Sequence, residues 1–256
     1  MSVFAGVLRA EWTKARTVRS TWWSLVTTTA LCVGLGVLIG SQLENAAPQQ
    51  RAVLTSAQIS FYPLLIGQIA LVVFGVLLAS AEYTTGTIRA SLAAVPDRGV
   101  FLAGKTLVAA GVAAGLGVVV AFGTFFATQA AIGAEGASLG DPGVLRAVFG
   151  AVGYLTLMCV FSLGIALVLR SSALSLGILI PLLFLNSQGL SSLPAIRSVT
   201  QYLPDQAGSG LMQVGPGTDL FVGERDFGPT GALFVLLAWV AAALMGGYLS
   251  LRRRDA

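Results

Sequence analysis

The chain contains no histidine, only two cysteines and few charged residues, and each of these shortages excludes a class of protein. Without histidine, a Ser-His-Asp triad, an HExxH zinc site and a histidine proton relay are all impossible. Cys32 and Cys159 fall inside apolar stretches without metal-type spacing, so we expect them to be inert packing residues. Charged residues make up 10% of the chain, whereas soluble domains carry about 25%. A soluble fold could not cover the apolar surface that remains.

Long apolar stretches take the place of the missing charges. Hydrophobic residues make up 55% of the 256 residues, and the mean hydropathy is +0.84. A helix of about 20 apolar residues crosses the roughly 30 Å hydrocarbon layer of a bilayer. Stretches of this kind lie at residues 22–41, 59–81, 106–132, 146–169, 173–190 and 229–251. They predict an all-α polytopic membrane protein, with a six-helix transmembrane domain at 22–256 and a cytoplasmic interfacial helix at 1–21.

The positive charges predict how these helices are oriented, because cytoplasmic loops are enriched in Lys and Arg. Six helices place both termini on the same side. Eleven of the fifteen cations fall on that side, namely Arg9, Lys14, Arg16, Arg19, Arg89, Arg98, Lys105, Arg170, Arg252, Arg253 and Arg254. We therefore expect a multi-pass protein of the plasma (inner) membrane with both termini cytoplasmic. The net charge of +4 reflects this topology, and the clustered basic patch of a nucleic-acid-binding protein is missing.

The segment before the first apolar stretch has the pattern of an amphipathic helix lying in the membrane interface. Its apolar face comprises Phe4, Val7, Leu8, Trp12 and Ala15. Glu11 falls in the middle of that face, where an unpaired carboxylate is costly. Two partners are open for Glu11: Lys14, three residues later on the same helix, or a cation of another loop.

A short polar segment, Glu82 to Arg98, separates the second apolar stretch from the third. It contains an acid, then Gly86-Thr87-Ile88-Arg89, and ends with Pro96 and Arg98. We expect a short helix here, capped at its start by Thr84 or Thr85 and stopped by Pro96, because proline disfavours helix at the residue before it.

This loop, together with "LRAEWTKARTVRSTWW" from Leu8 to Trp23, resembles the ABC-2 family of exporter permeases. The resemblance implies the membrane subunit of a bacterial exporter, paired with a second six-span copy or paralogue and with separately encoded ATP-binding cassette ATPase subunits. In that family the loop docks on the ATPase subunit, which implies contacts through Glu82, Gly86, Thr87, Arg89, Pro96 and Arg98. Glu11, Trp12 and Lys14 would belong to a docking helix. ATP and magnesium are expected on the ATPase subunit, and no cofactor in this chain.

The predicted spans carry no Asp, Glu, Lys or Arg near their middle, which argues against ion- or proton-coupled transport. The strongest polar or helix-breaking features inside them are Gln68, Pro181, Asn186 and Gln188. These four residues could line a path for an amphipathic substrate. Alternatively, the amides hydrogen-bond between helices and Pro181, like Pro63, only kinks its helix.

An outer segment of 38 residues, Ser191 to Gly228, precedes the last span and is long for an unstructured loop. The resemblance implies short re-entrant helices at this position. We place them at Tyr202 to Gln213.

Two short motifs match enzyme patterns but lie in the wrong context. Gly99 to Thr106 is spelled GxxxxGK[ST], but no buried strand precedes it and an apolar span follows, so we expect no nucleotide site. Lys105 is instead expected to snorkel to the cytoplasmic surface. Gly136 to Gly140 is spelled GxSxG, but Ser138 has no histidine partner in the chain.

Other functions remain open at this point. A secondary transporter or channel is the main alternative, and a membrane-embedded enzyme is a more distant one. A permease-like subunit could also transmit the motion of an ATPase to a partner protein without moving a substrate itself.

Overall fold

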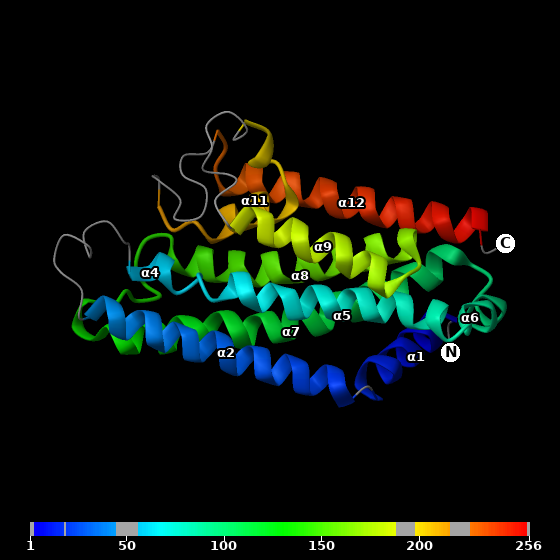
Figure 1. Cartoon of the computed structure of the whole chain (residues 1–256), viewed down its shortest axis with the longest axis horizontal. Coiled ribbons are helices and arrows are strands. Elements are labelled where there is room, and N and C mark those ends of the chain that lie inside the picture. Colours follow the sequence, from blue (N-terminus) through cyan, green and yellow to red (C-terminus); the bar gives the residue numbers. More distant parts are fainter. Residues whose placement is uncertain (1–2, 18, 45–55, 188–197, 216–225, 255–256) are drawn as a thin grey trace.

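The computed structural model describes residues 3–17, 19–44, 56–187, 198–215 and 226–254, and all regular elements within these ranges are helices. The long helices lie roughly along one axis (Figure 1). They are α2 (Arg19–Glu44), α5 (Leu64–Thr84), α7 (Arg98–Ile132), α8 (Val144–Leu169), α9 (Ser172–Ser187) and α12 (Pro229–Arg254). The short ones are α1 (Val3–Thr17), α4 (Ser56–Ile59), α6 (Ile88–Ala94), η1 (Gly133–Glu135), α11 (Pro204–Ser209) and η3 (Gly210–Met212).

Five stretches of the described chain are long and apolar enough to cross a membrane: α2, α4 with α5, α7, α8 and α12. They correspond to five of the six expected spans. The span expected at 173–190 is α9, whose 16 residues make a helix of about 24 Å. That length falls short of a roughly 30 Å hydrocarbon layer, so the sixth span is not confirmed. The last three residues of the expected span lie outside the described residues.

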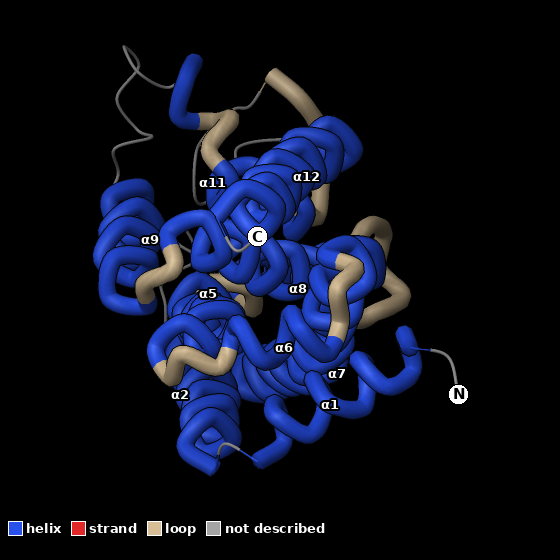
Figure 2. The backbone as a smooth tube through the Cα atoms, turned by 90° about the vertical axis from the view of Figure 1, so that its right-hand side faces the viewer, coloured by secondary structure: helices blue, strands red, loops and turns tan. Residues whose placement is uncertain are grey.

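Helix α8 lies in the middle of the bundle, where it packs against α5, α7 and α12 (Figure 2). Helix α2 packs against α7 and α5, and α9 packs against α5 and α8. The close packing depends on small residues at the crossings. At Gly75 of α5, for example, a Cβ atom would meet the Cys159 carbonyl and the Ser162 hydroxyl of α8 at less than 3.0 Å. Helices α2 and α12 expose most of their apolar surface, as expected of helices that face lipid or another subunit.

Pro63 does not kink the second span as expected, because the helix is interrupted there. The chain turns at Ser60 to Pro63, between α4 and α5, and Pro63 is the N-cap of α5 with a φ of −60°. Proline is tolerated in this position because a helix start leaves its backbone N–H unpaired in any case. Pro181 does lie inside a helix, α9.

The two ends of the bundle differ in their short elements. Helices α1 and α6 and both termini lie at one end (Figures 1 and 2), whereas α4 and α11 lie at the other. Helix α11 and η3 occupy the segment where we expected outer helices, and Arg146 of α8 donates a hydrogen bond of 2.6 Å to the carbonyl of Gln213. Re-entry of this segment into the membrane stays a prediction.

Candidate functional site

The polar loop forms a turn and a short helix at the end of the bundle that holds both termini. Gly86 has a φ of +71°, a left-handed conformation that glycine adopts without steric cost. Helix α6 follows, with Thr87 as its N-cap and without a side-chain cap bond, so the capping role expected for Thr84 or Thr85 is wrong. Its end is as expected, because α6 stops at Ala94, two residues before Pro96.

The inner face of α6 fixes the loop on the bundle. Ile88 and Leu92 are buried in a small apolar cluster with Phe101 of α7 and Leu251 of α12. Arg98 donates hydrogen bonds of 3.2 Å to the carbonyls of Leu92 and Pro96, which closes the loop on itself. The loop is therefore a packed element whose outer residues face away from the molecule.

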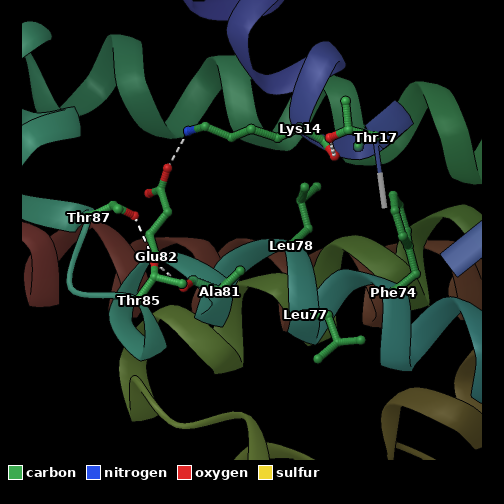
Figure 3. A pocket seen from close by; sticks show the side chains of 10 residues that line it. Lys14, Thr17, Phe74, Leu77, Leu78, Ala81, Glu82, Thr85 and Thr87 are labelled. Carbon is green, nitrogen blue, oxygen red and sulfur yellow. Dashed lines mark hydrogen bonds and ion pairs between the residues drawn. The ribbon is translucent and has the colours of Figure 1, made fainter. Parts of the chain in front are cut away.

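Beside this loop, two acids and two lysines form a buried ionic cluster that we call the quartet: Glu11, Lys14, Glu82 and Lys105. The Lys14 ammonium lies 2.7 Å from Oε1 of Glu11 and also contacts Oε1 of Glu82 (Figure 3). The Lys105 ammonium lies 2.7 Å from Oε2 of Glu11 and 3.7 Å from Oε2 of Glu82. The quartet thus joins α1, α5 and α7, and a hydrogen bond of 3.2 Å from Ser91 to Glu82 adds α6.

The quartet is almost fully buried apart from Lys14, so its charges must be paired within the protein. The Lys105 side chain is 0% exposed, and those of Glu11 and Glu82 are 2% and 6% exposed. The charges cancel, as a cluster of this kind requires, because breaking one buried ion pair costs about 3–5 kcal/mol. Lys14 and Lys105 are also the only lysines in the chain. A compact ammonium, unlike a planar guanidinium, can contact two carboxylates from one point.

Lys14 is the quartet member closest to solvent, with 43% of its side chain exposed. Burial alone would lower the pKa of Lys14, but hydrogen bonds and charges from Glu11 and Glu82 outweigh it. The pKa of Lys14 therefore lies above its ordinary value of 10.5, and the ammonium stays charged throughout the physiological range.

The quartet answers one question that the sequence left open and corrects one prediction. Glu11 binds both candidate partners, Lys14 on its own helix and Lys105 from another element. The prediction that Lys105 snorkels to the surface is wrong. The helix begins at Arg98, eight residues before the expected span, so Lys105 lies two turns inside α7 and under α1.

Of the six residues expected to contact an ATPase subunit, four are exposed and two have internal partners. Gly86, Thr87, Arg89 and Pro96 are exposed. Glu82 and Arg98 instead hold the loop in place. Arg89 forms no ion pair with Glu82, because the two lysines occupy that carboxylate.

Helix α1 buries a narrower stripe than its sequence suggests. Val7, Glu11 and Ala15 are buried, and α1 packs against α7, where Val7 lies against Gly104. Trp12 is 48% exposed. The face read as membrane-facing is thus partly a protein contact.

A pocket of about 430 Å³ lies between the end of α1 and the last turns of α5 (Figure 3). Phe74, Leu77 and Leu78 provide apolar walls, and Thr85 and Thr87 lie at its polar end. Lys14 and Glu82 also line it, but their charges are engaged with each other. The pocket therefore offers an apolar space beside the quartet and no free charge of its own.

The residues expected to line a pore have other surroundings in this chain. Gln68 is buried between helices, where its carbonyl accepts a hydrogen bond from Tyr154 of α8 and its amide donates to the Leu65 carbonyl at 3.0 Å. This is the inter-helix bond left open as the alternative. Pro181 is exposed on α9. The side chain of Asn186 and the whole of Gln188 lie outside the described residues.

The two enzyme-like motifs have clear structural roles. Gly99 to Thr106 form the first turns of α7, and the Asp97 carboxylate caps them by accepting from the amides of Gly99 at 2.8 Å and Val100 at 3.1 Å. These amides therefore belong to a helix start rather than to a phosphate-binding loop. Ser138 lies in an exposed turn, with its hydroxyl 3.0 Å from Asp141. Within the described residues no group of three or more His, Cys, Asp or Glu side chains could hold a metal ion.

A family model described as "ABC-2 family transporter protein" matches residues 7–186, which include all four quartet residues and the whole loop. No curated protein matches the chain.

Proposed function

Because the chain belongs to the ABC-2 family of transporter proteins, we propose that it is the permease subunit of an ATP-binding cassette exporter. It would pair with a second permease, a copy or a paralogue, and with separate ATPase subunits that supply ATP and magnesium. Both termini and the loop would face the cytoplasm, in line with the excess of Lys and Arg at that end.

The observation that carries the proposal is the exposed turn at Thr85 to Thr87 with Arg89 beside it. These residues are exposed although the loop itself is packed through Ile88 and Leu92. Within the described chain Arg89 has no partner, so its guanidinium is available for a bidentate contact with a carboxylate. A packed element with an exposed polar tip is suited to transmit a push from a soluble subunit to the helices behind it.

A substitution at Gly86 tests this contact with a matched control. Gly86 and Gly133 have φ values of +71° and +78°, and a Cβ atom would meet nothing within 4 Å at either position. Both are exposed, and they lie at the two ends of the bundle, Gly86 after α5 and Gly133 after α7. Both substitutions therefore place a side chain at positive φ, which costs about 1–3 kcal/mol. The ψ of Gly133 is −134°, outside the left-handed helical region, so the control substitution is not the milder of the two.

When both subunits are co-expressed, we expect the amount of ATPase subunit that co-purifies with Gly86→Trp to fall at least tenfold. The stimulation of that subunit's ATPase activity should be lost as well. Gly133→Trp should keep both. Wild-type assembly and activity in Gly86→Trp, with the protein folded in the membrane, would refute the loop as the contact.

A further inference from the structure

The quartet connects α1 to the loop, although the two are far apart in the sequence. Glu82 lies in the last turn of α5, three residues before the exposed turn. Lys105 lies in α7, just beyond the loop, and its ammonium also contacts the Leu78 carbonyl of α5 at 3.3 Å. We propose that Lys105 is a positioning residue that makes α1 and the loop at 82–98 move as one body when the ATPase subunit pushes on the loop. This inference rests on the proposed function.

The buried position of Lys105 is the physical reason for this coupling. Its acidic neighbours are Glu11 at 2.7 Å and Glu82 at 3.7 Å, and the Glu82 oxygen that faces it has no hydrogen bond in the described chain. If α1 moved away from α7, the short contact to Glu11 would be lost. The fully buried ammonium would then keep only one acidic neighbour, Glu82 at 3.7 Å, beside the Leu78 carbonyl at 3.3 Å. Joint movement of α1, the loop and the adjoining ends of α5 and α7 leaves every pair intact.

Lys14 contributes less to this coupling, although it touches the same two acids. With 43% of its side chain exposed, water can replace its carboxylate contacts at little cost. Lys105 has no such replacement, because its side chain is 0% exposed. We therefore expect Lys14→Met, combined with Glu82→Gln so that the cluster stays neutral and keeps the Lys105–Glu11 pair, to lower ATPase stimulation less than twofold.

The main test uses a variant that removes Lys105 without leaving an unpaired charge. Glu11→Gln/Lys105→Met keeps the Lys14–Glu82 pair and restores neutrality, and apolar replacement of a buried ion pair is often neutral for stability. We expect normal assembly with the ATPase subunit but at least tenfold lower ATPase stimulation.

Gln129→Met is the control, because Gln129 is a buried polar side chain near the other end of α7 that donates a hydrogen bond of 2.7 Å to Ser60. It should keep stimulation. Stimulation within twofold of wild type in the double variant would overturn the proposal.

A distance measurement on the otherwise unaltered complex tests the same point if the double variant does not accumulate. Spin labels at the exposed Thr13 and Ala90 report the α1–loop distance, and labels at Ala90 and Arg253 report the loop–α12 distance. On ATP addition the first distance should stay constant while the second changes. A change in the first distance would overturn the proposal. Absence of any ATPase subunit from wild-type preparations would instead count against the proposed function.

Discussion

Substitution of Gly104 by alanine should lift α1 from α7 at the point where the quartet begins. A Cβ atom at Gly104 would approach the Val7 side chain to less than 3.0 Å, and it would lie 3.4 Å from Val7 Cβ and 3.9 Å from the Leu8 amide. Valine cannot turn aside, because its χ1 angle has one strongly preferred value in a helix. The helix itself must therefore move by several tenths of an ångström or more. That movement would lengthen the contact between Glu11 and Lys105.

The expected magnitude follows from two opposing effects. Alanine in place of glycine stabilises a helix by roughly 0.8–1 kcal/mol. Overpacking a close contact costs about 1–3 kcal/mol. Gly111, two turns along the same helix, isolates the first effect, because a Cβ atom there would meet nothing within 4 Å. Gly104→Ala should therefore be less stable than Gly111→Ala by about 1–3 kcal/mol, the overpacking cost alone.

Thermal unfolding in detergent and co-purification of the ATPase subunit measure the two consequences. The second substitution Val7→Ala should restore the fit, so Val7→Ala/Gly104→Ala should be more stable than the sum of the single effects predicts, by about 1 kcal/mol or more. Equal stability of Gly104→Ala and Gly111→Ala, or strict additivity in the double variant, would refute the close packing of α1 on α7.

Two further predictions concern charge. Because the pKa of Lys14 is raised in the folded protein, its stabilising effect should be complete below pH 10.5 and should disappear as the pH rises through the folded pKa. The difference in Tm between wild type and Lys14→Met should therefore be constant at neutral pH and vanish only in alkali. A loss of this difference between pH 5 and 8 would contradict the raised pKa of Lys14. In a background without Cys32 and Cys159, an impermeant thiol reagent applied to intact cells should label a cysteine at Asp141 but not one at Arg98 or Arg253, and the opposite pattern would reverse the orientation.

The sequence predicted those features that depend on neighbouring residues, namely most helix positions and one helix end. Apolar stretches gave five long helices within a few residues at most ends, and Pro96 marked the end of α6 because proline restricts the residue before it. The start of α7 was placed eight residues late, because hydropathy marks the apolar part of a helix and not its polar first turns. Asp97, the N-cap, was the available signal for the true start.

Long-range contacts account for what the sequence did not reveal. Lys105 at the edge of an apolar stretch has the pattern of a snorkelling residue, and nothing nearby in sequence shows that α1 covers it. Gln68 could equally have faced a path or a neighbouring helix, and the choice depends on Tyr154, 86 residues away. Both outcomes depend on which helices become neighbours. Hydropathy periodicity leaves that arrangement undetermined.

Glu11 shows how one misplaced charge separates two uses of an amphipathic helix. A helix that lies on lipid has no partner to offer a carboxylate in its apolar stripe, so an acid there is costly. A helix that packs on protein can place the acid opposite a buried cation. Val7, Glu11 and Ala15 recur every four residues and are all buried, which makes the stripe a protein contact with Lys105 as the matching cation. Trp12, outside that stripe, is exposed. An acid inside an apolar stripe, paired with a lone lysine at the edge of a distant apolar stretch, is therefore evidence that the two helices meet.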